Sequence, residues 1–165
     1  VGVARVEALA DEIQSAAQES GVDPHLVGAI VFHESRGRVN ALSSAGAMGL
    51  MQLAPAAASD AAQRLGIDAP TNEQLMSDGA LNLRLGASHL AWLLAQGDMD
   101  LEQVLIAYNA GRAKLLRWIR EDGDYSAWRL EEIEAEHEGR STGTLRYARN
   151  VMAMRDRLRA RGNLR

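Results

Sequence analysis

Two short segments of this sequence combine residue types that could cleave a glycosidic bond. Glu34 and Ser35 end an apolar stretch, and a glycine-containing segment from Gly46 to Gln52 follows after a short loop. A carboxyl group among aliphatic side chains tends to keep its proton, because burial disfavours the charged form. A proton that is held near neutral pH is what a general acid for glycoside cleavage requires. The sequence therefore indicates Glu34 as a candidate general acid.

The spacing around Glu34 supports this interpretation. Three aliphatic residues precede it by three, four and seven positions, and on a helix all four share one face. They are Val31, Ile30 and Val27. The end of the helix adds an unfavourable interaction with the backbone dipole, which also raises the pKa of Glu34. Two other interpretations stay open: an ordinary surface glutamate, or one paired with Arg36 or Arg38.

Glycosidases ordinarily need a second carboxylate as base or nucleophile, and none has a definite spacing to Glu34. Five aspartates fit helix caps and turns better than catalysis: Asp60, Asp68, Asp78, Asp98 and Asp100. We therefore expect a single acid to act with help from the substrate.

Two further segments could contact a ligand, although each also has a structural explanation. The glycines between Gly46 and Gln52 permit close backbone approach, and Gln52 offers a donor and an acceptor. A turn that buries the apolar residues of this segment is, taken alone, the commoner explanation. In Ala107–Gly111, Asn109 and the final glycine suit a helix end, and Tyr108 suits the core. Neither segment decides the function alone.

Apolar residues recur at helical spacing through most of the chain, and no stretch alternates with the period that strands require. Asp23 and Pro24 form a well-specified helix start, as cap and first helical residue. The expected helices span residues 6–20, 24–34, 55–65, 83–94, 101–108, 115–119, 128–133 and 144–161. Residues 37–47 are expected to form a loop, with Gly37 as the helix stop. The pattern predicts one all-α domain.

The amino-acid composition and net charge exclude several classes of function. The chain has 165 residues, of which 47% are hydrophobic and 24% charged, as in ordinary soluble globules. A net charge of -4 gives no reason to expect nucleic acid as a partner. Cysteine is absent, which excludes disulfides, a thiol nucleophile and thiolate metal ligands. We expect no transmembrane segment, because no apolar run approaches the roughly 18 residues of a spanning helix. The N-terminus lacks an initiator Met and a signal-peptide core, which suggests a fragment or a mature form.

No metal or cofactor is expected. His33 and Glu34 lack the second histidine of a zinc-protease helix, and Gly46–Gly49 is too short for a phosphate-binding loop and lacks its lysine.

Two charged stretches are interpreted as solvated helix faces that pair partly with one another, and a partner surface or contact with an anionic wall polymer is the alternative. The acidic stretch contains Glu121, Asp122, Asp124, Glu131, Glu132, Glu134, Glu136 and Glu138, and the basic one Arg146, Arg149, Arg155, Arg157, Arg159, Arg161 and Arg165.

Taken in order, three segments resemble the hallmark motifs of the soluble lytic transglycosylases. They are Glu34-Ser35, Gly46-Ala47-Met48-Gly49-Leu50-Met51-Gln52-Leu53 and Ala107-Tyr108-Asn109-Ala110-Gly111. Val22-Asp23-Pro24, and Asn82 with Gly86 and Leu90, are also similar to this family. The resemblance covers about residues 6–158 and implies an all-α, goose-type lysozyme-like fold. It implies one catalytic domain over residues 1–165 that cleaves bacterial peptidoglycan.

The resemblance also implies roles for individual residues. Glu34 would be the sole catalytic acid and base, and Ser35 would orient it or touch the sugar. Met48 and Gln52 would line the glycan groove, and Gly49 would allow close approach of the ligand. Tyr108 and Asn109 would contact the N-acetylated sugar at the cleavage point. Tyr147 would form a hydrogen bond near the acid, and a core tyrosine bonded to a carbonyl is the alternative. Here Gly143-Thr144 stands where family members often carry Glu-Thr.

The implied reaction cleaves the β-1,4 bond between N-acetylmuramic acid and N-acetylglucosamine without water and without a cofactor. The muramic C6 hydroxyl closes a 1,6-anhydro ring, so the enzyme would be a lyase. Two alternatives stay open: a lysozyme-type hydrolase with an unrecognised carboxylate, and a glycan-binding or assembly module without turnover. From the substrate we expect a periplasmic or cell-envelope location, peptidoglycan strands and cell-envelope proteins as candidate partners, and a monomer.

Overall fold

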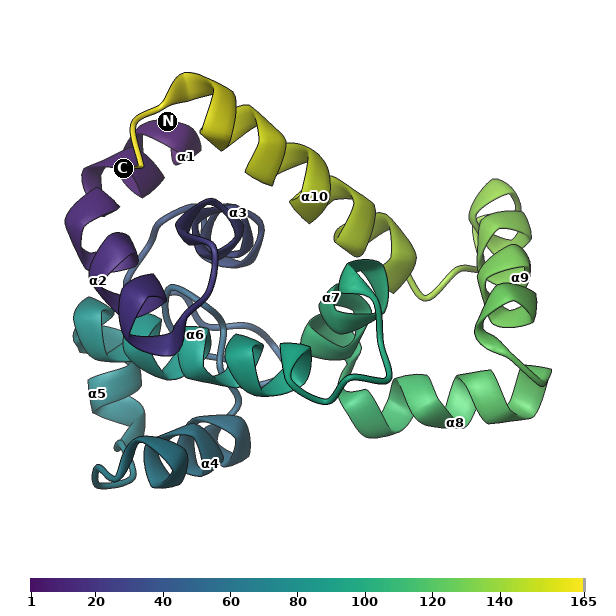
Figure 1. The fold of residues 1–165 in the computed structure, drawn as a ribbon, viewed down its shortest axis with the longest axis horizontal. Coiled ribbons are helices and arrows are strands. Elements are labelled where there is room, and N and C mark those ends of the chain that lie inside the picture. The colour runs from purple at the N-terminus through teal and green to yellow at the C-terminus, as the bar shows by residue number, and fades with distance from the viewer. Residues whose placement is uncertain (165) are drawn as a thin grey trace. The chain divides into compact units, whose positions relative to one another are not determined.

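A computed structural model of the protein describes residues 1–164. Arg165, the last residue of the predicted basic stretch and of the predicted domain, lies outside the described residues. Within this range the structure contains ten α-helices and no β-strand, which confirms the all-α prediction (Figure 1). The helices are α1 (Gly2–Ala8), α2 (Ala10–Ser20), α3 (Pro24–Ser35), α4 (Pro55–Leu65), α5 (Asn72–Ser77), α6 (Gly79–Leu94), α7 (Leu101–Ala110), α8 (Arg112–Asp122), α9 (Tyr125–His137) and α10 (Thr144–Arg161).

The chain divides into two compact units. The first contains Val1–Trp92 together with the segment from Ala153 onward, and the second contains Leu93–Met152. Helices α6 and α10 each contribute to both units. The single catalytic domain expected from the sequence stays a prediction.

Strong local signals give helix ends where the sequence predicts them. Asp23 caps α3 and accepts a hydrogen bond from the His25 N–H at 2.8 Å, with Pro24 as the first helical residue. Helix α4 ends at Gly66 in a left-handed conformation, and the Ile67 N–H donates to the Ala62 carbonyl at 3.0 Å. This bond is the long-range bond of a Schellman end.

Other boundaries differ from the prediction. Leu9 interrupts the helix expected over residues 6–20 and separates α1 from α2. Helix α5 is absent from the prediction because Leu75 is its only buried residue, so it has no apolar stripe. Asp60 lies inside α4 and is not a cap, whereas Asp78 and Asp100 do bond to N–H groups at helix starts.

The end of α3 is formed by Arg36 and not by a glycine. Arg36 takes a left-handed conformation with φ 57°, and Gly37 follows with φ 75°. Residues other than glycine adopt this region at a steric cost. The Arg36 guanidinium carbon lies 4.1 Å over the centre of the Phe32 ring, and this cation–π attraction offsets part of that cost.

Close packing surrounds α3 in the first unit. A Cβ built on Gly28 would lie 2.7 Å from the Leu164 side chain and 3.2 Å from Leu158, so only glycine lets the C-terminal segment approach. Arg161 pairs with Glu7 of α1, and the end of α10 accordingly lies beside the N-terminal helices (Figure 1). The helix that carries Glu34 is therefore fixed by both ends of the chain.

In the second unit, an ionic network joins α7 to α9. Glu102 accepts hydrogen bonds from Arg129 at 2.7 Å and from the Tyr125 hydroxyl at 2.5 Å. Burial alone would raise the pKa of Glu102, but these two donors outweigh burial and hold the pKa below its ordinary value. Trp128 stacks on Trp118 with ring centroids 5.6 Å apart, which joins α9 to α8.

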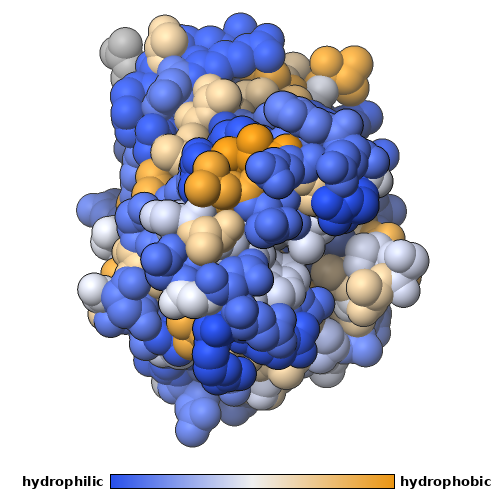
Figure 2. Space-filling view, turned by 90° about the vertical axis from the view of Figure 1, so that its right-hand side faces the viewer, coloured by the Kyte–Doolittle hydropathy of each residue, from blue (hydrophilic) through white to orange (hydrophobic). Residues whose placement is uncertain are grey.

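The acidic stretch of residues 121–138 is mostly exposed, as predicted for a solvated face. Figure 2 shows a surface that is mainly hydrophilic, with small apolar patches. Glu132 is the exception: it is 6% exposed and accepts hydrogen bonds from the Thr142 N–H and hydroxyl. Arg149 pairs with Glu136 at 2.6 Å, so the two charged stretches are partly paired with one another.

No helix within residues 1–164 has the length and apolar character to cross a membrane.

His89 of α6 is a half-buried titratable group in the first unit. Its ring stacks on Trp92 with centroids 6.0 Å apart. Burial, together with the nearby Arg64 cation, lowers the pKa of His89 from 6.5 to about 4, and Asp60 opposes this shift. The folded protein therefore resists protonation of His89.

We expect the free energy of unfolding to fall as the pH drops below 6.5, because unfolded chains then bind a proton that folded His89 does not. Between pH 6.5 and about 5, above the ordinary glutamate pKa of 4.5, this loss is about 1.5 kcal/mol. Urea unfolding across this range checks it. His89→Gln should remove most of the slope and His137→Gln, on the exposed end of α9, should keep it. An unchanged slope in His89→Gln would contradict the assignment.

Candidate active site

Glu34 is the second-last residue of α3 and lies at the edge of its buried face. Val27, Ile30 and Val31 are 0% exposed, as their spacing predicts, whereas Glu34 is half-buried. The core-facing residues of α3 thus fix the helix, and its last turn presents the carboxyl group to a surface cleft.

This Glu34 cleft has a volume of about 470 Å³ and is open to solvent. It is lined by Glu34, Arg38, Asn40, Ala41, Leu42, Ser43 and Gln52. Glu34 is the only carboxyl group among these lining residues, and Arg38 is the only cation. Glu34 and Gln52, which belong to different predicted motifs, are brought together here.

Ser35 is 1% exposed, and its hydroxyl is occupied by the backbone. The hydroxyl donates to the Leu50 carbonyl at 2.8 Å, lies 3.1 Å from the Val31 carbonyl, and accepts from the Gly37 N–H at 3.2 Å. Of the two roles implied by the resemblance, this geometry favours orientation of the acid helix. Direct contact between Ser35 and a sugar is not supported, because the side chain is buried.

The segment from Gly46 to Leu53 is a tight turn. Met48 and Leu53 exchange two backbone hydrogen bonds of 3.0 Å, and Leu50 and Met51 between them are fully buried. The structural explanation of this segment is therefore correct, and it coexists with a position beside Glu34. Met48 is 9% exposed and does not line the Glu34 cleft, so its contact with substrate stays a prediction.

Gly49 is required for a different reason from the one predicted. Its φ is +80°, and a Cβ at this position would overlap the Asn82 side chain and the Leu75 carbonyl. The close approach seen here is thus made by the protein's own residues, and close approach of a ligand to Gly49 stays a prediction.

Asn82 is the positioning residue of this turn, a role that the sequence did not reveal. It is 0% exposed; its amide oxygen accepts from the Met51 N–H at 2.9 Å, and its nitrogen donates to the Met48 and Leu75 carbonyls at 2.9 and 3.1 Å. An asparagine on an apolar helical face was the available signal, because a buried amide must find partners.

Gln52 completes the turn and lines the cleft. It takes φ 51°, which is unusual for a residue with a side chain. Its amide nitrogen donates to the Ala41 and Gly49 carbonyls at 3.0 and 3.1 Å. These bonds use the donors of Gln52 internally and orient the amide beside Glu34.

The remaining predicted site residues belong to the second unit. Tyr108 is half-buried and Asn109 exposed in the last turn of α7, which ends at Gly111 with φ 96°. Tyr147 is half-buried in α10, and its hydroxyl oxygen is buried. The stripe expected along α10 is confirmed, since Val151 is 0% and Leu158 1% exposed. A joint site of these residues with Glu34 stays a prediction from the resemblance.

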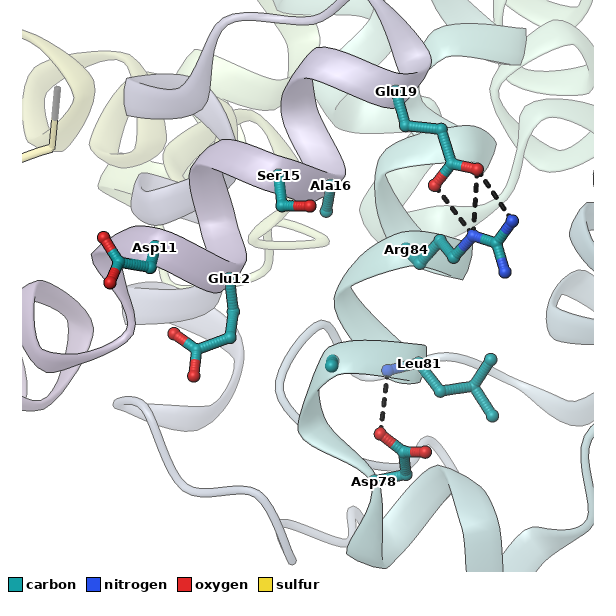
Figure 3. Close-up of a pocket in the computed structure, with 9 residues that line it drawn as sticks. Asp11, Glu12, Ser15, Ala16, Glu19, Asp78, Leu81 and Arg84 are labelled. Carbon is teal, nitrogen blue, oxygen red and sulfur yellow. Dashed lines mark hydrogen bonds and ion pairs between the residues drawn. The ribbon is translucent and has the colours of Figure 1, made fainter.

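A larger groove of about 740 Å³ between α2 and α6 contains none of the predicted site residues (Figure 3). Its walls carry the carboxylates of Asp11, Glu12, Glu19 and Asp78. The one cation in its lining, Arg84, faces Glu19 and pairs with it at 2.7 Å. An anionic polymer such as peptidoglycan would be repelled by this groove, so the Glu34 cleft is the better candidate.

Among residues 1–164, no group of three or more His, Cys, Asp or Glu side chains is placed to hold a metal ion.

The known proteins that this chain resembles in sequence and fold are named lytic transglycosylases. The chain is 31% identical over 125 residues to the endo-type membrane-bound lytic murein transglycosylase A of Salmonella paratyphi B, covering 70% of this chain and 61% of that protein. An inactive mutant of the lytic transglycosylase Slt from Pseudomonas aeruginosa has a TM-score of 0.75 and 26% identity, over 93% of this chain and 24% of that one. The complex of the 70-kDa soluble lytic transglycosylase with bulgecin A has a TM-score of 0.75 and 25% identity, over 91% and 24%.

The chain therefore spans about three fifths of the length of the curated relative and about a quarter of each solved chain. The likeness to the solved structures confirms the predicted lysozyme-like, all-α fold class. Residues 11–130 match the family model of the transglycosylase SLT domain, which is more than half of the chain. With this match, the chain belongs to the transglycosylase SLT domain family.

Proposed function

We propose that this chain is a peptidoglycan lytic transglycosylase that uses Glu34 as both acid and base. The observation that carries the proposal is the single carboxyl group in a cleft built from two of the three predicted motifs. Hydrolases of the usual type place two carboxyl groups on either side of the scissile bond. A cleft lined by one carboxyl group suits a reaction in which no water needs activation. Family membership and the lytic transglycosylase names of the relatives support the same activity.

Glu34 alone can carry out both proton transfers of this reaction, first as the acid and then as the base. Glu34 first gives its proton to the glycosidic oxygen between N-acetylmuramic acid and N-acetylglucosamine, and the bond from that oxygen to the muramic C1 breaks. The N-acetyl oxygen of the substrate stabilises the positive charge at C1. The Glu34 carboxylate then takes the proton of the muramic C6 hydroxyl, and the bond between O6 and C1 closes the 1,6-anhydro ring. The second step is intramolecular, so the attacking oxygen has a high effective concentration.

Other residues would support this chemistry from two directions. Ser35 and Asn82 would hold the acid helix and the turn of Gly46–Leu53 in register through their buried hydrogen bonds. Gln52 would face the glycan beside Glu34. Contacts of Met48, Tyr108, Asn109 and Tyr147 with the sugar are part of the proposal on the strength of the resemblance. We further propose a cell-envelope location, glycan strands as partner, cell-envelope proteins as further partners, and a monomer.

The products distinguish lytic transglycosylation from hydrolysis. Purified peptidoglycan is digested in water enriched in oxygen-18, and the released muropeptides are weighed by mass spectrometry. We expect anhydro-ended products that are lighter than reducing-ended ones by one water and carry no oxygen-18. Reducing ends labelled with oxygen-18 would identify a hydrolase. Glycan binding without any released product would identify a binding module.

A further inference from the structure

Arg38 is the cation of the Glu34 cleft, and the reaction proposed above does not use it. It follows the end of α3 by three residues, is exposed, and lines the cleft together with Glu34 and Gln52. Its Nε donates to the Ser35 carbonyl at 3.2 Å. This bond ties the base of the guanidinium to the acid helix and leaves its two terminal NH₂ groups to the cleft.

The terminal nitrogens of Arg38 form no ion pair with a carboxylate of residues 1–164. The other arginines near α3 are engaged: Arg159 pairs with Asp23 at 2.6 Å, Arg161 with Glu7, and Arg36 lies over the Phe32 ring. An unpaired guanidinium that is held by its Nε beside a cleft is suited to bind an anion.

We propose that Arg38 determines substrate specificity by binding a carboxylate on the substituent of the muramic residue. This inference rests on the proposed function, since that substrate supplies the anion. The muramic residue carries a lactyl group whose carboxyl is free in peptide-free strands and is joined to a carboxylate-bearing peptide in others. Both forms bring a negative charge to the cleft.

Electrostatics gives the reason for a cation at this place. A carboxylate that enters the cleft is repelled by Glu34 whenever Glu34 is ionised, as it is between the two steps of the reaction. Arg38 offsets this repulsion, and its planar fork can bind both oxygens of a carboxylate. A neutral chito-oligosaccharide has no lactyl group, so Arg38 contributes nothing to its binding. Selectivity between these glycans is therefore the property that Arg38 controls.

The experiment compares three glycans: peptide-bearing strands, strands stripped of peptide, and chito-oligosaccharides. Arg38→Gln is paired with Arg36→Gln, a charge removal two residues away and outside the cleft lining. For Arg38→Gln we expect KM for the carboxylate-bearing glycans to rise about tenfold with a smaller change in kcat. Arg38→Lys should recover part of the loss, because it restores the charge without the fork. Arg36→Gln should match the parent protein.

Dissociation constants measured by calorimetry in the Glu34→Gln background separate this inference from the proposed function. There we expect Arg38→Gln to weaken binding of carboxylate-bearing strands about tenfold and to leave chito-oligosaccharide binding unchanged. A loss confined to peptide-bearing strands identifies a peptide carboxylate, and a loss on both kinds of strand identifies the lactyl region. Equal weakening on the neutral oligosaccharide, or none on any glycan, would overturn the inference. Absence of turnover in the parent protein would overturn only the proposed function, because the binding contrast needs no turnover.

Discussion

Glu34→Gln is expected to lower the rate of fragment release from purified peptidoglycan by about 1000-fold or more, since acid and base catalysis each contribute 10²–10⁴-fold. Glutamine has nearly the shape of glutamic acid, but it can neither give an acidic proton to the leaving oxygen nor take one from the C6 hydroxyl. The variant keeps the other lining residues of the Glu34 cleft, so its affinity for glycan strands should change little. The rate is followed by the release of soluble muropeptides, and affinity by calorimetry.

A matched control for this variant is Glu131→Gln, which removes an exposed carboxylate of α9 far along the chain from the predicted motifs. It should release fragments at the parent rate. If Glu34→Gln kept more than about a tenth of the parent rate, Glu34 could not be the general acid, because such catalysis contributes at least about 100-fold. The catalytic carboxyl group would then have to be sought outside the Glu34 cleft.

The fold was predictable wherever a local signal decided it. The cap at Asp23, the end at Gly66 and the span of α10 depend on residues within one or two turns of each other. Leu9 and Arg36 were not predictable in this way. Leu9 interrupts a continuous apolar pattern, and Arg36 takes a left-handed conformation beside the Phe32 ring, which stop-residue preferences do not reveal. At Arg36 the contact with the Phe32 ring helps to override the local propensity.

The sequence predicted which residues lie at the candidate site better than it predicted the structural role of each residue. The spacing placed Glu34 at the edge of the buried face of α3, and it lies there. Ser35 and Gly49 belong to the same region, where buried hydrogen bonds and internal packing explain these residue types, and contact of either residue with a ligand stays a prediction. Asn82 acts on Met51 across 31 positions of sequence, and no local periodicity carries information over that distance. Sequence motifs thus predicted Glu34 as the candidate acid, whereas the contacts that hold its helix and the neighbouring turn are visible only in the structure.

Asn82→Ala is expected to reduce the free energy of unfolding by about 3 kcal/mol or more, since buried groups that lose their partners cost about 1–3 kcal/mol each. The Met51 N–H would lose its Asn82 acceptor, and the Leu75 carbonyl would lose a donor in a site that water does not reach. The smaller side chain also leaves a cavity beside Gly49. For a chain of this size, thermal unfolding should shift down by about 10 °C.

Activity measured well below the unfolding temperature separates the local effect from global stability. Because Asn82 bonds to both Met48 and Met51, its loss should loosen the turn that positions Gln52 beside Glu34. We therefore expect fragment release at 20 °C below the transition to fall about tenfold, since misplacement of about 1 Å can cost up to 100-fold. Asn150→Ala, an exposed asparagine inside α10, should change neither the transition nor the rate. A transition within about 2 °C of the parent, less than 1 kcal/mol, would mean that the turn is held without Asn82.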